Sequence, residues 1–219
     1  MFIGHFALGF AAKRLAPKTS LGWLMASAVG LDLLWPVFVL AGWEEVRIEP
    51  GNTAFTPLAF VHYPWTHSLL MAGAWGAALA IVYAAVTRYI TGALVLGLCV
   101  VSHWGLDAVV HRPDLPLTPE GMRMIGLGLW NNVPATLALE GVLFALGVWL
   151  YMRASKPRDR AGLVGFWLFI AFLVIVYVSN VFGTPPPDAQ AVAVMAMGLW
   201  PVVIWAGWFD AHHVYAHVG

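Results

Sequence analysis

Long hydrophobic runs, separated by short polar breaks, follow one another along almost the whole chain. The first run, residues 2–15, is too short to cross a bilayer, which takes about 20 residues. Six longer runs come after it, at residues 21–41, 66–87, 91–111, 132–152, 161–182 and 190–209. This pattern predicts an all-α polytopic membrane bundle of about six transmembrane helices, with an N-terminal partial or re-entrant helix. Residues 1–219 are expected to form a single transmembrane domain.

The overall composition places the chain among membrane proteins independently of the runs. Hydrophobic residues make up 61% and charged residues 10% of the 219 positions, against about 25% charged residues in soluble domains. The formal net charge is zero and the sequence has no basic run, so nucleic acid is excluded as a partner and membrane lipid is expected instead. The single cysteine, Cys99, excludes a disulfide within one chain and is expected to pack in the core.

Positive charges collect on one side of the predicted bundle. If each run crosses the membrane once, eight basic residues share one side and three share the other. The richer side is expected to be cytoplasmic, because Lys and Arg are retained there. Its residues are Lys13, Arg14, Lys18, Arg88, Arg153, Lys156, Arg158 and Arg160, and those of the outer side are Arg47, Arg112 and Arg123. Lys13 and Arg14 also follow the first run, whereas a signal peptide has its charges before the apolar core.

Three ionisable residues lie four positions apart within one hydrophobic run: His103, Asp107 and His111. Four residues advance an α-helix by only about 40° beyond a full turn, so the three side chains share one face. A charge at the centre of a bilayer costs at least about 2.5 kcal/mol. Polar residues placed at that cost predict a functional site with partners on neighbouring helices. His111, like His62, is expected nearer the interface.

Other buried polar residues are predicted at similar depth. At about 1.5 Å of rise per residue, Asp32 lies about 16 Å and His103 about 18 Å from the cytoplasmic start of its own run. His5 lies about 12 Å beyond Lys13. His67 begins its run at the outer surface, so tilt or a kink near Pro64 must bring it inward. The site is therefore expected in the outer half of the bilayer.

These residue types suit a divalent metal ion. Imidazole and carboxylate without thiolate indicate zinc first, with manganese or iron(II) as alternatives, and a bound water could become a nucleophile. Five candidates exceed one tetrahedral shell, so we consider higher coordination, two ions, or a carboxylate acting as general base. The candidate ligands are His5, Asp32, His67, His103 and Asp107.

Glu140, near the middle of the run at 132–152, is the remaining acid expected inside the bundle. It is interpreted as a general base, as an acceptor behind the ligands, or as a partner of Asn131, Asn132 or an outer arginine. The C-terminal histidines are expected on the cytoplasmic side, away from the site: His212, His213 and His217.

Four motifs occur in an order that resembles bacterial inner-membrane proteins regarded as metal-dependent hydrolases. They are Gly4-His5, Asp32, HYPWTHS at 62–68 and SHWGLD at 102–107, and the resemblance covers about residues 1–120. It implies a multi-pass protein of the inner (cytoplasmic) membrane, a metal at the five candidate ligands, and hydrolysis. The chain departs from that pattern at Leu34, where a second acid is common, and at Tyr63, where an arginine is common. These changes weaken the case for a second metal and for an anion anchor.

From these features we expect hydrolysis of an ester in a lipid or lipid-linked substrate, with Asp107 and Glu140 as catalytic carboxylates. Two alternatives remain open. One is a transporter or proton-coupled carrier with an intramembrane His/Asp relay. The other is a non-enzymatic accessory subunit whose histidines hold helices together.

Overall fold

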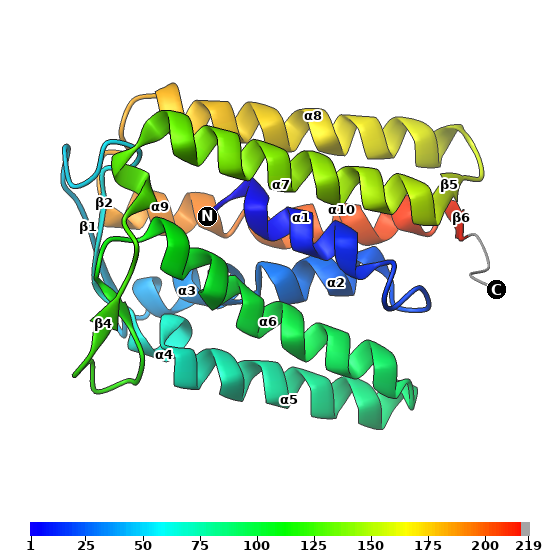
Figure 1. Ribbon diagram of the computed structural model, residues 1–219, viewed down its shortest axis with the longest axis horizontal. Coiled ribbons are helices and arrows are strands. Elements are labelled where there is room, and N and C mark those ends of the chain that lie inside the picture. Colours follow the sequence, from blue (N-terminus) through cyan, green and yellow to red (C-terminus); the bar gives the residue numbers. More distant parts are fainter. Residues whose placement is uncertain (216–219) are drawn as a thin grey trace.

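The computed structural model describes residues 1–215 as a bundle of roughly aligned helices with short strands at its two ends (Figure 1). The helices are α1 (Ile3–Ala12), α2 (Leu21–Ala28), α3 (Gly30–Leu40), α4 (Pro64–His67), α5 (Leu69–Thr87), α6 (Ile90–Val110), η1 (Leu129–Asn131), α7 (Val133–Ala154), α8 (Arg160–Phe182), α9 (Ala189–Ala196) and α10 (Leu199–Asp210). The strands are β1 (Glu45–Ile48), β2 (Leu58–His62), β3 (Leu115–Pro116), β4 (Met124–Ile125), β5 (Ser155–Pro157) and β6 (His213–Tyr215).

The predicted membrane bundle is confirmed. Helices α5, α6, α7 and α8, together with the segment Ala189–Asp210 that holds α9 and α10, are five elements long and apolar enough to cross a membrane. Helices α2 and α3 meet the same criteria only as a pair and bend by 58° relative to each other, so they form either a broken sixth span or a re-entrant loop. Helix α1 has only 10 residues, so it is the partial helix that the sequence predicted. The protein is a membrane-spanning helical protein.

Two breaks in the helices shape the region that carries the polar residues. Between α2 and α3, Val29 leaves helical geometry at φ −101° and ψ 18°, and Asp32 then lies in the first turn of α3. Before α5, the chain forms the one-turn helix α4 and then extends at Ser68, whose Oγ accepts from Met71 N and caps α5. His67 therefore reaches the bundle on a separate short helix, where the sequence predicted tilt or a kink.

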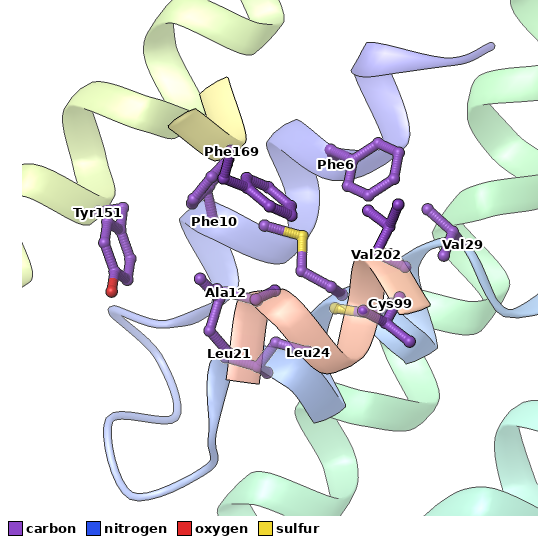
Figure 2. Packing of buried hydrophobic residues seen from close by; sticks show 14 of the residues in the cluster. Phe6, Phe10, Ala12, Leu21, Leu24, Val29, Cys99, Tyr151, Phe169 and Val202 are labelled. Carbon is purple, nitrogen blue, oxygen red and sulfur yellow. The ribbon is translucent and has the colours of Figure 1, made fainter. Parts of the chain in front are cut away.

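Helix α1 lies inside the bundle, and the N-terminal end of the chain is near the middle of the molecule (Figure 1). Its Phe6 and Phe10 are fully buried, and each makes an edge-on contact with Phe169 of α8 (Figure 2). Gly147 of α7 allows this insertion, because a Cβ there would lie 2.4 Å from the Ala7 carbonyl oxygen. Since so close an approach excludes any side chain, α1 is held by the backbone surface of α7.

The two ends of the bundle differ in structure. One end, called the hairpin end, carries the antiparallel pairs β1–β2 and β3–β4 and the short helix α4 (Figure 1). The other, called the basic end, carries β5 paired with β6 and the loops and adjoining helix ends that hold eight of the 11 Lys and Arg residues. The loop after α3 forms the β1–β2 hairpin. Cys99 is buried in the main apolar cluster, as expected.

Candidate metal centre

Four helices bring the five predicted ligands together, and we call this group the His/Asp cluster. Two overlapping sets of ligand atoms each lie within 4.8 Å of one another: His5, His103 and Asp107 in one set, and Asp32, His67 and His103 in the other. His5 comes from α1, Asp32 from α3, His67 from α4, and the remaining two from α6. The side chain of Asp32 is 30% exposed and the other four are at most 4% exposed, so Asp32 marks the open side of the cluster.

Helix α6 supplies His103 and Asp107 one turn apart, with His103 Nε2 3.2 Å from Asp107 Oδ2. The opposite ring nitrogen, His103 Nδ1, lies 2.9 Å from the Ala28 carbonyl oxygen. A carbonyl only accepts, so Nδ1 carries the proton and Nε2 presents its lone pair to the cluster. Ala28 ends α2, where the carbonyls of the last turn lack partners within the helix. The break between α2 and α3 thus orients His103.

Helix α1 contributes His5 to the cluster, and both His5 and the Met1 amino group contact Asp107. His5 Nε2 lies 3.1 Å from Asp107 Oδ1, and the Met1 amino group donates to the same oxygen at 2.6 Å. The His5 ring stacks on His103, with centroids 3.6 Å apart and planes 3° from parallel. These contacts engage Oδ1 and leave Oδ2 of Asp107 facing the other histidines.

The remaining donors lie at separations between a hydrogen bond and a van der Waals contact. Asp32 Oδ1 lies 3.5 Å from His67 Nε2 and 3.7 Å from His103 Nε2. Asp107 Oδ2 lies 3.9 Å from His67 Nε2. These distances exceed good hydrogen bonds, whereas ligands bound at about 2.1 Å around a tetrahedral ion are about 3.4 Å apart. His103 Nε2 is buried without a hydrogen-bond partner, so its lone pair is available to a ligand.

The two sets of ligand atoms share His103, which limits how many ions they fit. A neutral imidazole nitrogen has one lone pair, and His103 Nδ1 already donates to Ala28. His103 can therefore serve only one ion at a time. Asp32, His67, His103 and Asp107 could offer such an ion two imidazole nitrogens and two carboxylate oxygens.

Glu140 lies beside α1 and does not join either set of ligand atoms. Its Oε2 accepts from the backbone N–H groups of Phe2, at 2.8 Å, and Gly4, at 3.2 Å. Its Oε1 is buried and unpartnered. Glu140 thus holds the start of the helix that carries His5, in place of the asparagine or arginine partners that the sequence suggested.

His111, His212 and His213 also lie apart from the cluster. His111 Nδ1 is 3.0 Å from Asp114 Oδ1 and 3.3 Å from the Tyr63 hydroxyl, at the hairpin end. At the basic end, His212 pairs with Asp159 at 2.8 Å, and His213 Nδ1 donates to the Phe209 carbonyl at 2.9 Å. His217 lies outside the described residues.

Two residues that the sequence did not single out, Glu44 and Thr66, lie behind His67: Thr66 contacts the ring, and Glu44 contacts Thr66. Glu44, from the loop after α3, accepts from Thr66 N at 2.8 Å and from Thr66 Oγ1 at 2.7 Å. Thr66 Oγ1 is in turn 2.7 Å from His67 Nδ1. Burial raises the pKa of the Glu44 carboxyl, against the hydrogen bonds from Thr66, which favour its charged form. The adjacency of Thr66 to His67 was a usable signal, but nothing in the sequence links Glu44 to them.

Comparison with known proteins gives one partial likeness. The chain is 27% identical over 154 residues to the anti-sigma-F factor NrsF of Caulobacter vibrioides. The aligned region covers 65% of this chain and 64% of that protein. The chain thus spans less than two thirds of the length of this relative. No family model matches the chain, and no solved structure does. The expected resemblance to metal-dependent hydrolases finds no support in these comparisons. They relate part of the chain to an anti-sigma factor instead.

Proposed function

We propose that the His/Asp cluster binds one divalent metal ion and that the protein uses it to hydrolyse an ester of a lipid or lipid-linked substrate in the bacterial inner membrane. The observation that carries this proposal is the spacing of the nearest donors. Two imidazole nitrogens and two carboxylate oxygens lie 3.2–3.9 Å apart around a lone pair of His103 that has no other partner.

In this proposal the ligands are Asp32, His67, His103 and Asp107. His5 orients the Asp107 carboxylate through its contact with Oδ1. Four protein ligands leave a position for water when the ion takes five or six ligands, which zinc does in some reactions and manganese or iron does readily. When bound, such an ion supplies Lewis-acid chemistry and lowers the pKa of its water.

The surrounding residues determine what can approach. Asp32, on the bent α2–α3 pair, is the only member of the cluster with substantial exposure, so water and substrate are expected to enter beside it. The other members are enclosed by helices, which disfavours a wide aqueous mouth and favours a substrate delivered from the membrane. Asp107 and Glu140 remain the proposed proton-transferring carboxylates, Asp107 because Oδ2 faces the cluster and Glu140 because its Oε1 is unpartnered.

Hydrolysis can be tested with purified protein in detergent and a panel of phosphate-ester and acyl-ester lipids. The expected result is cleavage by the parent after loading with zinc or manganese, and none by chelator-treated protein or by Asp32→Asn. If metal-loaded parent cleaves no ester beyond the chelator-treated control, the hydrolase proposal is overturned.

A second candidate is supported by the likeness to NrsF. In this case the protein is a non-enzymatic membrane component that binds a sigma factor, and the His/Asp cluster ties helices together. Affinity purification from the source cells distinguishes the two. Recovery of a sigma factor with both the parent and Asp32→Asn would support this candidate, and its absence from both would count against it.

A further inference from the structure

We propose that Glu44 and Thr66 are positioning residues that determine which ring nitrogen of His67 carries the proton. They keep the proton on Nδ1 and leave the lone pair of Nε2 free to bind a metal. This inference rests on the proposed metal centre and adds residues that the ligand set does not contain. The juxtaposition of a loop carboxylate, a threonine hydroxyl and a ligand imidazole carries it.

The three groups form a continuous chain of short hydrogen bonds within the protein. Glu44, Thr66 and His67 are 4%, 0% and 3% exposed, so water does not compete for these bonds. Both carboxylate oxygens of Glu44 are used, one by the backbone N–H and the other by the hydroxyl of Thr66. Such bonds to a carboxylate are stronger than neutral ones.

The direction of each bond follows from counting protons. A carboxylate only accepts, so the single hydroxyl proton of Thr66 points to Glu44. The Thr66 oxygen must then accept from His67, which places the ring proton on Nδ1. Nε2 is left with its lone pair, toward Asp32 and Asp107.

His67 and His103 thereby adopt the same tautomer, with the proton on Nδ1, but different groups accept that proton. A carbonyl at the end of α2 fixes His103, whereas a carboxylate from the loop after α3 fixes His67 through a hydroxyl. Partners of this kind, behind a ligand histidine, typically change metal affinity by 10–100-fold when removed. Glu44 also brings a negative charge close to the site.

Glu44 has a structural role as well, because it accepts the backbone N–H of Thr66 within α4. The decisive variants must leave that bond in place. Thr66→Val removes only the hydroxyl, and Thr66→Ser restores it. Glu44→Gln keeps an acceptor for the backbone N–H but makes its amide a donor to Thr66 Oγ1, so the hydroxyl proton must turn toward His67 Nδ1. The ring proton then moves to Nε2, where it blocks metal binding.

The test combines two measurements on full-length protein. In metal-free protein labelled with ¹⁵N-histidine, NMR should place the proton of His67 on Nδ1 in the parent and Thr66→Ser, and on Nε2 in Glu44→Gln. Competition with a chelator should show about 10–100-fold weaker Zn²⁺ binding in Thr66→Val and Glu44→Gln. Thr53→Val is the matched control, because Thr53 is a buried loop threonine bonded only to Thr56.

The outcomes separate this inference from the metal proposal. If the parent binds Zn²⁺ and His67→Ala does not, unchanged affinity and unchanged ring protonation in Thr66→Val and Glu44→Gln overturn the positioning role alone. If the parent binds neither Zn²⁺ nor Mn²⁺, the metal proposal fails and the ligand role of His67 fails with it. Weaker Zn²⁺ binding in Thr66→Val and Glu44→Gln, with parent affinity in Thr66→Ser and Thr53→Val, supports the positioning role of Glu44 and Thr66.

Discussion

The bundle buries charged groups in two regions, the basic end and the His/Asp cluster, and the two regions differ in how completely their groups are hydrogen-bonded. At the basic end, Asp210 accepts from Lys13 at 2.8 Å, from Leu21 N at 2.8 Å and from Tyr151 at 2.9 Å, and it also contacts the Tyr215 hydroxyl. In the His/Asp cluster, one nitrogen of His103 and one of His5 have no partner, and several donors stand too far apart to bond each other. A complete network stabilises the fold, whereas an incomplete one has room for a ligand.

The largest stability effect is expected at the basic end. Lys13→Met leaves the buried carboxylate of Asp210 without its cation, and breaking a buried pair in this way costs about 3–5 kcal/mol. Unfolding of the detergent-solubilised protein, followed by circular dichroism, measures the loss. The double variant Lys13→Met/Asp210→Asn should recover part of it, because no charge is then left alone. A Lys13→Met protein as stable as its parent would show that this network does not hold the fold.

Helix α1 connects the two regions, since it carries His5 near its start and Lys13 directly follows its end. Gly147→Val should push α1 away from α7 and destabilise the protein by about 1–3 kcal/mol. Gly141→Val, on the same helix, is the control, because a Cβ at Gly141 meets no atom within 4 Å. Equal unfolding midpoints for the two variants would contradict the close approach of α1 and α7.

Glu140 tests whether the start of α1 matters for the cluster. Glu140→Ala leaves two buried backbone N–H groups without an acceptor, which we expect to cost about 1–3 kcal/mol. Glu140→Gln retains an acceptor, so the loss of stability should be smaller and the metal should stay bound. If Glu140→Gln also lowers ester hydrolysis by about 10²–10⁴-fold at unchanged metal content, a general-base role is supported. Full activity would assign Glu140 to structure only.

The smallest stability effect is expected in the His/Asp cluster. Asp32→Asn changes no volume and removes no complete hydrogen bond, so the unfolding free energy of metal-free protein should change by less than about 1 kcal/mol. Chemical unfolding of chelator-treated parent and variant gives this value. A loss comparable to that of Lys13→Met would mean that both regions are structural.

The sequence predicted the parts of the site that follow from helical geometry. The four-residue spacing of His103 and Asp107 fixes a shared face on any α-helix, and the depth of Asp32 and His5 follows from the rise per residue. The separate helix α4 was missed, although Ser68 is a helix-capping residue three positions before Met71, whose N–H it accepts. The partner of Thr66, Glu44, is 22 residues away and depends on how the β1–β2 hairpin folds back. No local pattern encodes such a contact.

The metal content of purified protein tests the central claim most directly. Parent, His103→Ala and His213→Ala should be purified side by side and analysed for zinc, manganese and iron, because His103 lies in the cluster and His213 at the basic end. About one equivalent of one divalent metal in the parent and in His213→Ala, and none in His103→Ala, is the expected result. Equal metal content in all three proteins, or none in the parent after exposure to each ion, would contradict a metal centre at the His/Asp cluster.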